Sequence, residues 1–290
     1  MAAAGYGNGG MDGYNRGRVS REVRSLSNPA APSFDSAAPA GADAVAGSSW
    51  RALAGSATRL ARGALAQACA LCAADAGNAL LCAACAASLP RLPAACPLCA
   101  LPAPGAVACG ACLAHPPPFA ATVAAFVYAF PVDRLLHQFK YAGRLALADW
   151  AAAALTAATV RALAARGGAE MPDLVAAVPL SAARQRERGF NQAHEIAARV
   201  ARSLCLPVGH PLARAERGAP QAALPWSARA GNVRGAFACR RDVRGLAIAL
   251  VDDVMTTGAT LAEAATMLKR AGAARVEAWV VARTLPPAAA

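Results

Sequence analysis

The sequence predicts an α/β domain, in which helices flank a parallel sheet, preceded by a small cysteine-rich module. Two observations support this fold class. From about residue 119 onward, short apolar runs of strand length alternate with segments of helical period, as in proteins with parallel sheets. Ahead of them, eight cysteines stand in four C-x-x-C pairs. The 290-residue chain is therefore expected to contain two ordered parts of different character.

The first 68 residues precede both parts. Residues 1–47 are rich in Gly, Ala, Ser, Asn and Pro without any period, and we expect a disordered tail. Residues 48–68 are expected to form a leader helix, because apolar residues and arginines alternate with helical spacing. No apolar signal core or uninterrupted membrane span is visible, so the predicted location is the cytoplasm, without membrane insertion.

The cysteine-rich module, residues 69–115, is predicted to be a double zinc ribbon. Two thiolates at positions i and i+3 can face one metal, and two such knuckles complete a closed tetrahedral S4 shell, which makes the two expected zinc ions structural. Sequential pairing of the knuckles is the simplest arrangement, while crossed pairing and iron–sulfur ligation are the alternatives. The predicted ligands are Cys69, Cys72, Cys82, Cys85, Cys96, Cys99, Cys109 and Cys112.

The second part, residues 119–286, contains the alternating elements. Strands are expected where short apolar runs occur, at residues 123–130, 174–178, 246–251 and 275–282. Helices are expected where apolar residues recur every three or four positions, at residues 132–141, 145–165, 191–204 and 260–271. Residues 210–244 are rich in Arg and Pro and have no clear period, so we expect a functional loop or lid there.

A phosphate-binding loop is predicted directly after the strand at residues 246–251, since α/β sheets bind ligands at the carboxyl ends of strands. Consecutive backbone N–H groups, threonine hydroxyls, a glycine and the start of a helix favour an anion. Asp252 and Asp253 would repel phosphate, so we assign them to sugar hydroxyls or a divalent cation; an acidic turn or helix cap is the alternative. The loop residues are Met255, Thr256, Thr257, Gly258, Ala259 and Thr260.

These residues, LVDDVMTTGAT, resemble the motif with which type I phosphoribosyltransferases bind 5-phosphoribosyl-1-pyrophosphate (PRPP): a hydrophobic strand, then Asp-Asp-x-x-Thr-Thr-Gly-x-Thr. The resemblance implies a type I phosphoribosyltransferase-like parallel sheet with flanking helices, and Mg²⁺-bound PRPP as the ligand. It also implies that Asp252 and Asp253 are catalytic groups that contact the ribose hydroxyls, and that the loop holds the 5-phosphate.

Further segments, preceded by the C-x-x-C pairs, are similar to the ComF family. They are HQFKYAGR at residues 137–144, VPLSAARQRERGFNQA at residues 178–193 and NVRGAF at residues 232–237. ComF-like proteins are competence-associated and phosphoribosyltransferase-like. The likeness spans about residues 69–283 and implies a role in DNA uptake, with single-stranded DNA and DNA-uptake proteins as partners.

Type I phosphoribosyltransferases bind pyrophosphate at the loop that here follows residues 174–178. The resemblance therefore assigns pyrophosphate to Arg184 and Arg188, which suit it because guanidinium groups bind phosphate in a bidentate manner. A solvated basic turn, followed by a helix that Asn191 caps, is the alternative. Lys140, one of only two lysines, is also assigned to pyrophosphate, with an exposed lysine at a helix end as the alternative.

The lid-like segment departs from the family pattern. ComF-like sequences often show Thr-x-x-Gln after arginines, whereas this chain has Gly218 in place of the threonine and keeps Gln221. Lid closure is thus expected to differ in detail. Arg214, Arg217 and Arg229 are candidate contacts.

The net charge of +12 has two interpretations: attraction to polyanions, or an arginine-rich coding bias. Two functions accordingly remain in view. One is a phosphoribosyltransferase with an unidentified acceptor, and the other is a non-catalytic module that binds PRPP and single-stranded DNA. Few aromatic residues are available for base stacking, since aromatic residues are 5% of the chain.

Overall fold

The computed structural model describes residues 67–167, 170–214 and 235–286, which all belong to one compact unit spanning residues 54–290. Several predictions concern residues outside these ranges. They are the tail at residues 1–47, the leader helix apart from its last two residues, the lid residues Arg217, Gly218, Gln221 and Arg229, and the first half of NVRGAF.

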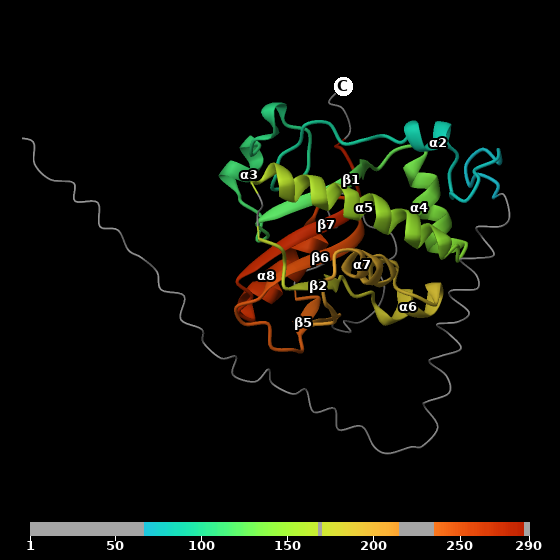
Figure 1. Ribbon diagram of the computed structural model, residues 1–290. Coiled ribbons are helices and arrows are strands. Elements are labelled where there is room, and N and C mark those ends of the chain that lie inside the picture. The colour runs from blue at the N-terminus through green and yellow to red at the C-terminus, as the bar shows by residue number, and fades with distance from the viewer. Residues whose placement is uncertain (1–66, 168–169, 215–234, 287–290) are drawn as a thin grey trace, which may run out of the picture. The chain divides into compact units, whose positions relative to one another are not determined.

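A five-stranded parallel sheet forms the centre of the described chain, in the order β1-β7-β6-β2-β3 (Figure 1). The strands are β1 Ala121–Val127, β2 Leu174–Ala177, β3 Val208–Gly209, β6 Ala247–Met255 and β7 Arg275–Arg283. A separate antiparallel pair joins β4 Leu212–Arg214 to β5 Phe237–Cys239. The predicted fold class, a parallel sheet in an α/β domain, is therefore confirmed.

Helices cover both faces of this sheet (Figure 1). Helices α4 Val132–Tyr141, α5 Ala146–Ala165 and α7 Gln192–Ser203 pack on one face, and α8 Ala259–Arg270 packs on the other. Neighbouring residues of β6 alternate between the two cores: Val251 packs with α5 and α7, while Leu250 packs with α8. Burial on both faces explains why the strand reads as a continuous apolar run.

The strand that ends in the two acids is longer than predicted. β6 continues to Met255, so Asp252 and Asp253 lie within the strand and not in the loop after it. The cause is tertiary: β6 is a central strand, and its pairing with β7 continues through Asp252 opposite Val280 and Met255 opposite Arg283. Pairing with an adjacent strand overrides the low intrinsic strand preference of aspartate.

The predicted arginine loop contains a short helix, α6 Ala182–Arg188. Its ends carry ordinary cap signals: the Ser181 side chain accepts a hydrogen bond from the amide of Arg184, and Gly189 adopts a left-handed conformation with φ 75°. Asn191 then caps α7 by accepting hydrogen bonds from the amides of Ala193 and His194. The capping role considered for Asn191 is therefore confirmed.

The cysteine module contains only short helical turns, α2 Ala83–Ala87, η1 Pro104–Ala106 and α3 Gly110–Ala114. It is attached directly to the sheet: Arg91 forms a bridge with Phe126 of β1, and its guanidinium lies 5.1 Å from the centre of that ring. The other expected irregular stretch, residues 210–244, supplies β4 and β5 in its described parts. None of the described helices is long and apolar enough to span a bilayer.

Candidate functional site

The two acids of β6 face different surroundings, because consecutive residues of a strand point to opposite faces. Asp253 Oδ2 lies 2.9 Å from Lys140 Nζ of α4, and both side chains are largely buried, at 12% and 18% exposure. Asp252 instead lines a small pocket together with the predicted phosphate loop. The pocket is formed by Asp252, Val254, Met255, Thr256, Gly258, Thr260 and Leu261.

Burial and the adjacent carboxylate of Asp253 make ionisation of Asp252 unfavourable. They raise its pKa to about 7, although the amide of Asp253 and the charges of Lys140 and Arg214 oppose the shift. Asp252 is therefore poised to lose its proton near neutral pH, when a cation or a hydroxyl donor approaches. Of the two acids, Asp252 lines the pocket and Asp253 pairs with Lys140; their assignment to sugar hydroxyls or a divalent cation stays a prediction.

The loop itself is three residues long, from Thr256 to Gly258, between β6 and α8. Gly258 has φ 83°, which favours glycine, and a Cβ there would lie 2.6 Å from Met255 Cε, so the end of the methionine side chain would have to shift. Within the described chain the amides of Thr257 and Gly258 donate no hydrogen bond. Free amides beside the N-terminus of a 12-residue helix are suited to an anion.

Arg188 lies against α4 at the same edge. Its Nη2 is 3.3 Å from the Tyr141 hydroxyl, its guanidinium is 5.2 Å from the centre of that ring, and its Nη1 donates to Gln192 Oε1 at 3.0 Å. Arg188 Nε and Gln192 Nε2 are both buried donors without a partner in the described chain. Two unpaired donors on contacting side chains favour an acceptor-rich ligand, because unpaired buried polar groups are costly.

Arg214 is close enough to both Asp252 and Arg184 to interact with their charges. Burial lowers the pKa of Arg214, the positive charge of Arg184 lowers it further, and the negative charge of Asp252 opposes both. The Arg214 guanidinium rests 5.4 Å from the centre of the Phe237 ring. Lys140 and Arg214 are thus the basic residues that interact directly with the acids, whereas Arg184 and Arg186 are both exposed on α6. The pyrophosphate roles of Lys140, Arg184 and Arg188 stay predictions.

Two residues of this site were not singled out from the sequence. Gln192 directly follows the cap residue of α7 and is 1% exposed. Arg283 ends β7, is 4% exposed, and donates to the carbonyls of Met255 and Thr256 at the base of the loop. An arginine that directly follows the apolar run at residues 278–282 was a usable signal for the second.

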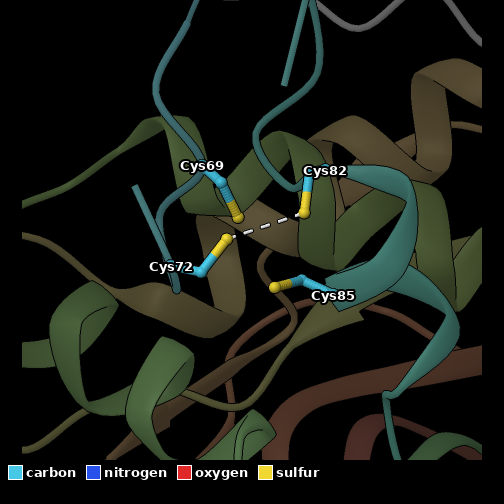
Figure 2. Close-up of side chains that lie close together, drawn as sticks. All are labelled: Cys69, Cys72, Cys82 and Cys85. Carbon is cyan, nitrogen blue, oxygen red and sulfur yellow. Dashed lines mark hydrogen bonds between the residues drawn. The ribbon is translucent and has the colours of Figure 1, made fainter. Parts of the chain in front are cut away.

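The eight module cysteines gather into two groups in sequential order, which answers the pairing question. Within each group all four Sγ atoms lie within 4.8 Å of one another, and Figure 2 shows those of the first group converging. We call them the first cysteine site and the second cysteine site. They comprise Cys69, Cys72, Cys82 and Cys85, and Cys96, Cys99, Cys109 and Cys112, respectively.

The sulfur geometry fits a tetrahedral metal. Cys72 Sγ lies 3.7 Å from Cys82 Sγ, and Cys99 Sγ lies 3.7 Å from Cys109 Sγ. A tetrahedral centre with metal–sulfur bonds of about 2.3 Å places its sulfurs about 3.8 Å apart, whereas a disulfide needs about 2.05 Å. Both groups are therefore built to hold a structural metal ion.

The protonation of the thiols also points to a cation. Although burial opposes ionisation, backbone N–H groups from Cys82, Cys72 and Leu71 lower the pKa of Cys69 to about 6. Cys96 behaves in the same way, with a pKa of about 6. Hydrogen bonding with the thiols of Cys72 and Cys82 raises the pKa of Cys85 to about 12. A bound metal ion would supply the positive charge that all four cysteines of a group need in order to be thiolates together.

Comparison with known proteins assigns the class first. The family model described as phosphoribosyl transferase domain matches residues 192–286, which include α7, β6, the phosphate loop and β7. The fold and this match define a phosphoribosyltransferase-like domain behind a cysteine module.

Curated relatives then assign the family. DNA utilization protein YhgH of Salmonella typhimurium is 37% identical over 179 residues, which cover 59% of this chain and 75% of that protein. Competence protein F of Haemophilus influenzae is 30% identical over 160 residues, which cover 54% of this chain and 69% of that protein. Competence protein ComFC of Bacillus subtilis is 36% identical over 113 residues, which cover 37% of this chain and 43% of that protein. The chain belongs to the ComF family.

Proposed function

We propose that this protein binds Mg²⁺-PRPP at the carboxyl edge of its parallel sheet. One observation carries the proposal: Asp252 lines the same small pocket as Thr256, Gly258 and Thr260. A carboxylate beside free amides suits a ligand with a phosphate at one end and hydroxyl groups a few bonds away. A phosphorylated ribose has both, and a simple anion lacks the hydroxyl groups.

Each part of the site has a role in this proposal. The amides of Thr257 and Gly258 and the hydroxyls of Thr256 and Thr260 hold the 5-phosphate. Asp252 accepts hydrogen bonds from the ribose hydroxyls or contacts the Mg²⁺ ion. Asp253 acts from the other face of β6, where it orients Lys140. Mg²⁺, when bound, neutralises charge on the pyrophosphate oxygens.

Pyrophosphate is assigned to the basic residues on the adjacent segments. Arg188 Nε and Gln192 Nε2 donate to no partner among the described residues, and Arg214 adds positive charge near Asp252. This arrangement would stabilise the departing pyrophosphate if the phosphoribosyl group is transferred. Transfer would break the bond between C1 and pyrophosphate and form a new bond from C1 to an acceptor nucleophile.

The test measures the binding of PRPP first and the transfer of its phosphoribosyl group second. Titration calorimetry with PRPP and Mg²⁺ should show one site per chain, weakened at least tenfold in Asp252→Asn, a loss of about 1.4 kcal/mol. Asp242→Asn is the matched control, since Asp242 pairs only with Arg244 on the surface. Pyrophosphate release is then measured with nucleobases, ammonia donors and DNA as acceptors. The absence of PRPP binding by the native protein would contradict the proposal.

A second candidate function is a PRPP-binding module that also binds single-stranded DNA, in keeping with the names of the DNA utilization and competence relatives. The observation in its favour is an exposed aromatic ring in contact with a basic residue. Tyr141 is 56% exposed and carries Arg188 on its ring. Bases stack on such rings. Salt-sensitive DNA binding that weakens in Tyr141→Ala, without any PRPP-dependent pyrophosphate release, would favour this function.

A further inference from the structure

Arg283 connects the phosphate loop to the second cysteine site. Its Nη1 donates to the carbonyls of Met255 at 3.0 Å, of Thr256, and of Thr284 at 2.9 Å. Its Nε donates to the carbonyl of Cys99 at 2.8 Å. One buried guanidinium thus binds the base of the loop and a metal-ligating residue at the same time.

The backbone around Cys99 is anchored to the sheet at two more points. The Thr122 amide of β1 donates to the carbonyl of Pro97 at 2.8 Å, and the Thr122 hydroxyl donates to that of Leu98 at 2.6 Å. Three consecutive carbonyls, those of Pro97, Leu98 and Cys99, are therefore bound by residues of the sheet. Their position depends on the cysteine site, because Cys96 and Cys99 flank them as ligands of one S4 group.

The hydrogen bonds of Arg283 also determine where the loop amides point. In a trans peptide the carbonyl of one residue and the N–H of the next point in opposite directions. When the Thr256 carbonyl points at Arg283, the Thr257 N–H must point away from it. That amide has no hydrogen-bond partner in the described chain, so it is free for a ligand phosphate.

We propose that Arg283 is a positioning residue through which metal loading of the second cysteine site sets the orientation of the phosphate-loop amides, and so the affinity for the 5-phosphate. The inference rests on the proposed binding of PRPP. With the S4 shell closed by metal, the Cys99 carbonyl holds Arg283, and Arg283 holds the Met255 and Thr256 carbonyls. Without metal, no bond holds the four sulfur atoms of the second cysteine site together, so the Cys99 carbonyl is free to move and the loop loses its support.

The coupling must act in both directions, because a ligand that binds the supported loop more tightly also stabilises the metal-loaded site. PRPP should therefore protect the second cysteine site. Among the described residues, no hydrogen bond connects the first cysteine site with the loop: the amides of Cys69, Ala70 and Ala73 donate within the module, to the carbonyls of Ala74, Leu80 and Cys69. This site serves as an internal reference in the same molecule.

The experiment measures metal loss and thiol exposure together in the full-length protein. Metal is withdrawn with a chromogenic chelator, freed thiols are alkylated with N-ethylmaleimide, and mass spectrometry reports the labelled cysteines of each site. Addition of PRPP with Mg²⁺ is expected to slow labelling of Cys96 and Cys99 at least fivefold. It should leave Cys69 and Cys72 unchanged.

Variants then test the role of Arg283. Arg283→Met should keep two metals per chain, bind PRPP at least fivefold more weakly and lose the protection of Cys96 and Cys99. Arg283→Lys should recover only part of the PRPP affinity and of the protection of Cys96 and Cys99, because one ammonium cannot reach all four carbonyls. Arg275→Met is the matched control: Arg275 begins the same strand, 3.4 Å from Glu277, far from the loop. It should keep full protection.

Each outcome decides between the two proposals. If the native protein does not bind PRPP in calorimetry, the proposed function and this inference both fail. If it binds PRPP but both cysteine sites are labelled equally fast with and without it, only this inference fails. Equal protection in Arg283→Met and the native protein would also overturn it. Should Arg283→Met not fold, the native comparison still decides, and Thr122→Val supplies a milder variant that should reduce the protection.

Discussion

The two cysteine sites are alike in sequence and differ in their attachment to the rest of the protein. In each, the inner cysteines are ten residues apart and their Sγ atoms lie 3.7 Å apart. The first site contributes Cys69 to the apolar core that also contains α4 and α5. The second forms an apolar cluster of its own and is hydrogen-bonded to β1 and β7. The same set of four cysteines is therefore joined to the apolar core in the first site and to the strands of the sheet in the second.

The cysteines of the two sites also differ in their exposure to solvent. Cys72 of the first site is exposed and only Cys69 is buried, whereas Cys96 and Cys112 of the second site are both buried. Metal should leave the first site more readily, because water and chelators reach an exposed thiolate first. The second site should keep its metal longer than the first, and its metal content should affect ligand binding more strongly.

The largest effect should come from breaking the second site. Cys99→Ser removes a metal ligand, and the expected loss is several kcal/mol of folding free energy, together with loss of PRPP binding. Cys72→Ser is the counterpart in the first site and should release one metal while PRPP affinity stays within about twofold. Metal analysis and calorimetry on both variants check this. Equal loss of PRPP affinity in the two would remove the distinction between the sites.

A glycine substitution in the loop should have the next largest effect. Gly258→Ala adds strain at φ 83° and a contact of 2.6 Å with Met255 Cε, so it should lower stability by about 1–3 kcal/mol and weaken PRPP binding. Gly245→Ala is the control, because its φ is 75° and a Cβ there meets nothing within 4 Å. Thermal melting should show the smaller shift for Gly245→Ala, and PRPP affinity should change only in Gly258→Ala.

The pH dependence of stability should reveal Asp252. Because its folded pKa is about 7 and its unfolded value is about 3.9, the folded state holds the extra proton between these values. The contribution of protonated Asp252 to the free energy of unfolding is favourable at low pH and is lost as the pH rises from about 4 through about 7. Asp252→Asn should therefore be more stable than the native protein at pH 8, on the order of 1–3 kcal/mol, and about equal at pH 4. Denaturant unfolding at the two pH values measures this, and an unchanged difference between them would contradict it.

The smallest effect should come from Thr122→Val, which deletes the hydrogen bond from Thr122 Oγ1 to the Leu98 carbonyl and keeps the side-chain shape. We expect a loss of about 1 kcal/mol of stability and faster metal release from the second site alone. Thr266→Val, which removes a hydroxyl bond within α8 to the Ala262 carbonyl, is the control. Faster release from the first site as well would show that the sites are not independent.

Local pattern was enough to locate the main elements and the candidate ligands. C-x-x-C spacing revealed the metal knuckles, since two thiolates three residues apart face one centre in any fold. Apolar runs revealed the central strands, and the threonine- and glycine-rich turn after 246–251 revealed the loop, because such turns expose amides. The bounds of β6 were missed because Asp252 and Asp253 are held in the strand by β7, a partner from a later part of the chain.

The relations between these parts depend on long-range packing. The ion pair of Asp253 with Lys140 and the hydrogen bond of Arg188 with Tyr141 both join segments that are separate in the sequence. Arg283 is the clearest case, since it contacts Cys99 across 184 positions of the chain. Spacing within a motif follows from local backbone geometry. Contacts between motifs follow from the order and twist of the strands, and only the assembled sheet brings a cysteine knuckle and a phosphate loop to the same arginine.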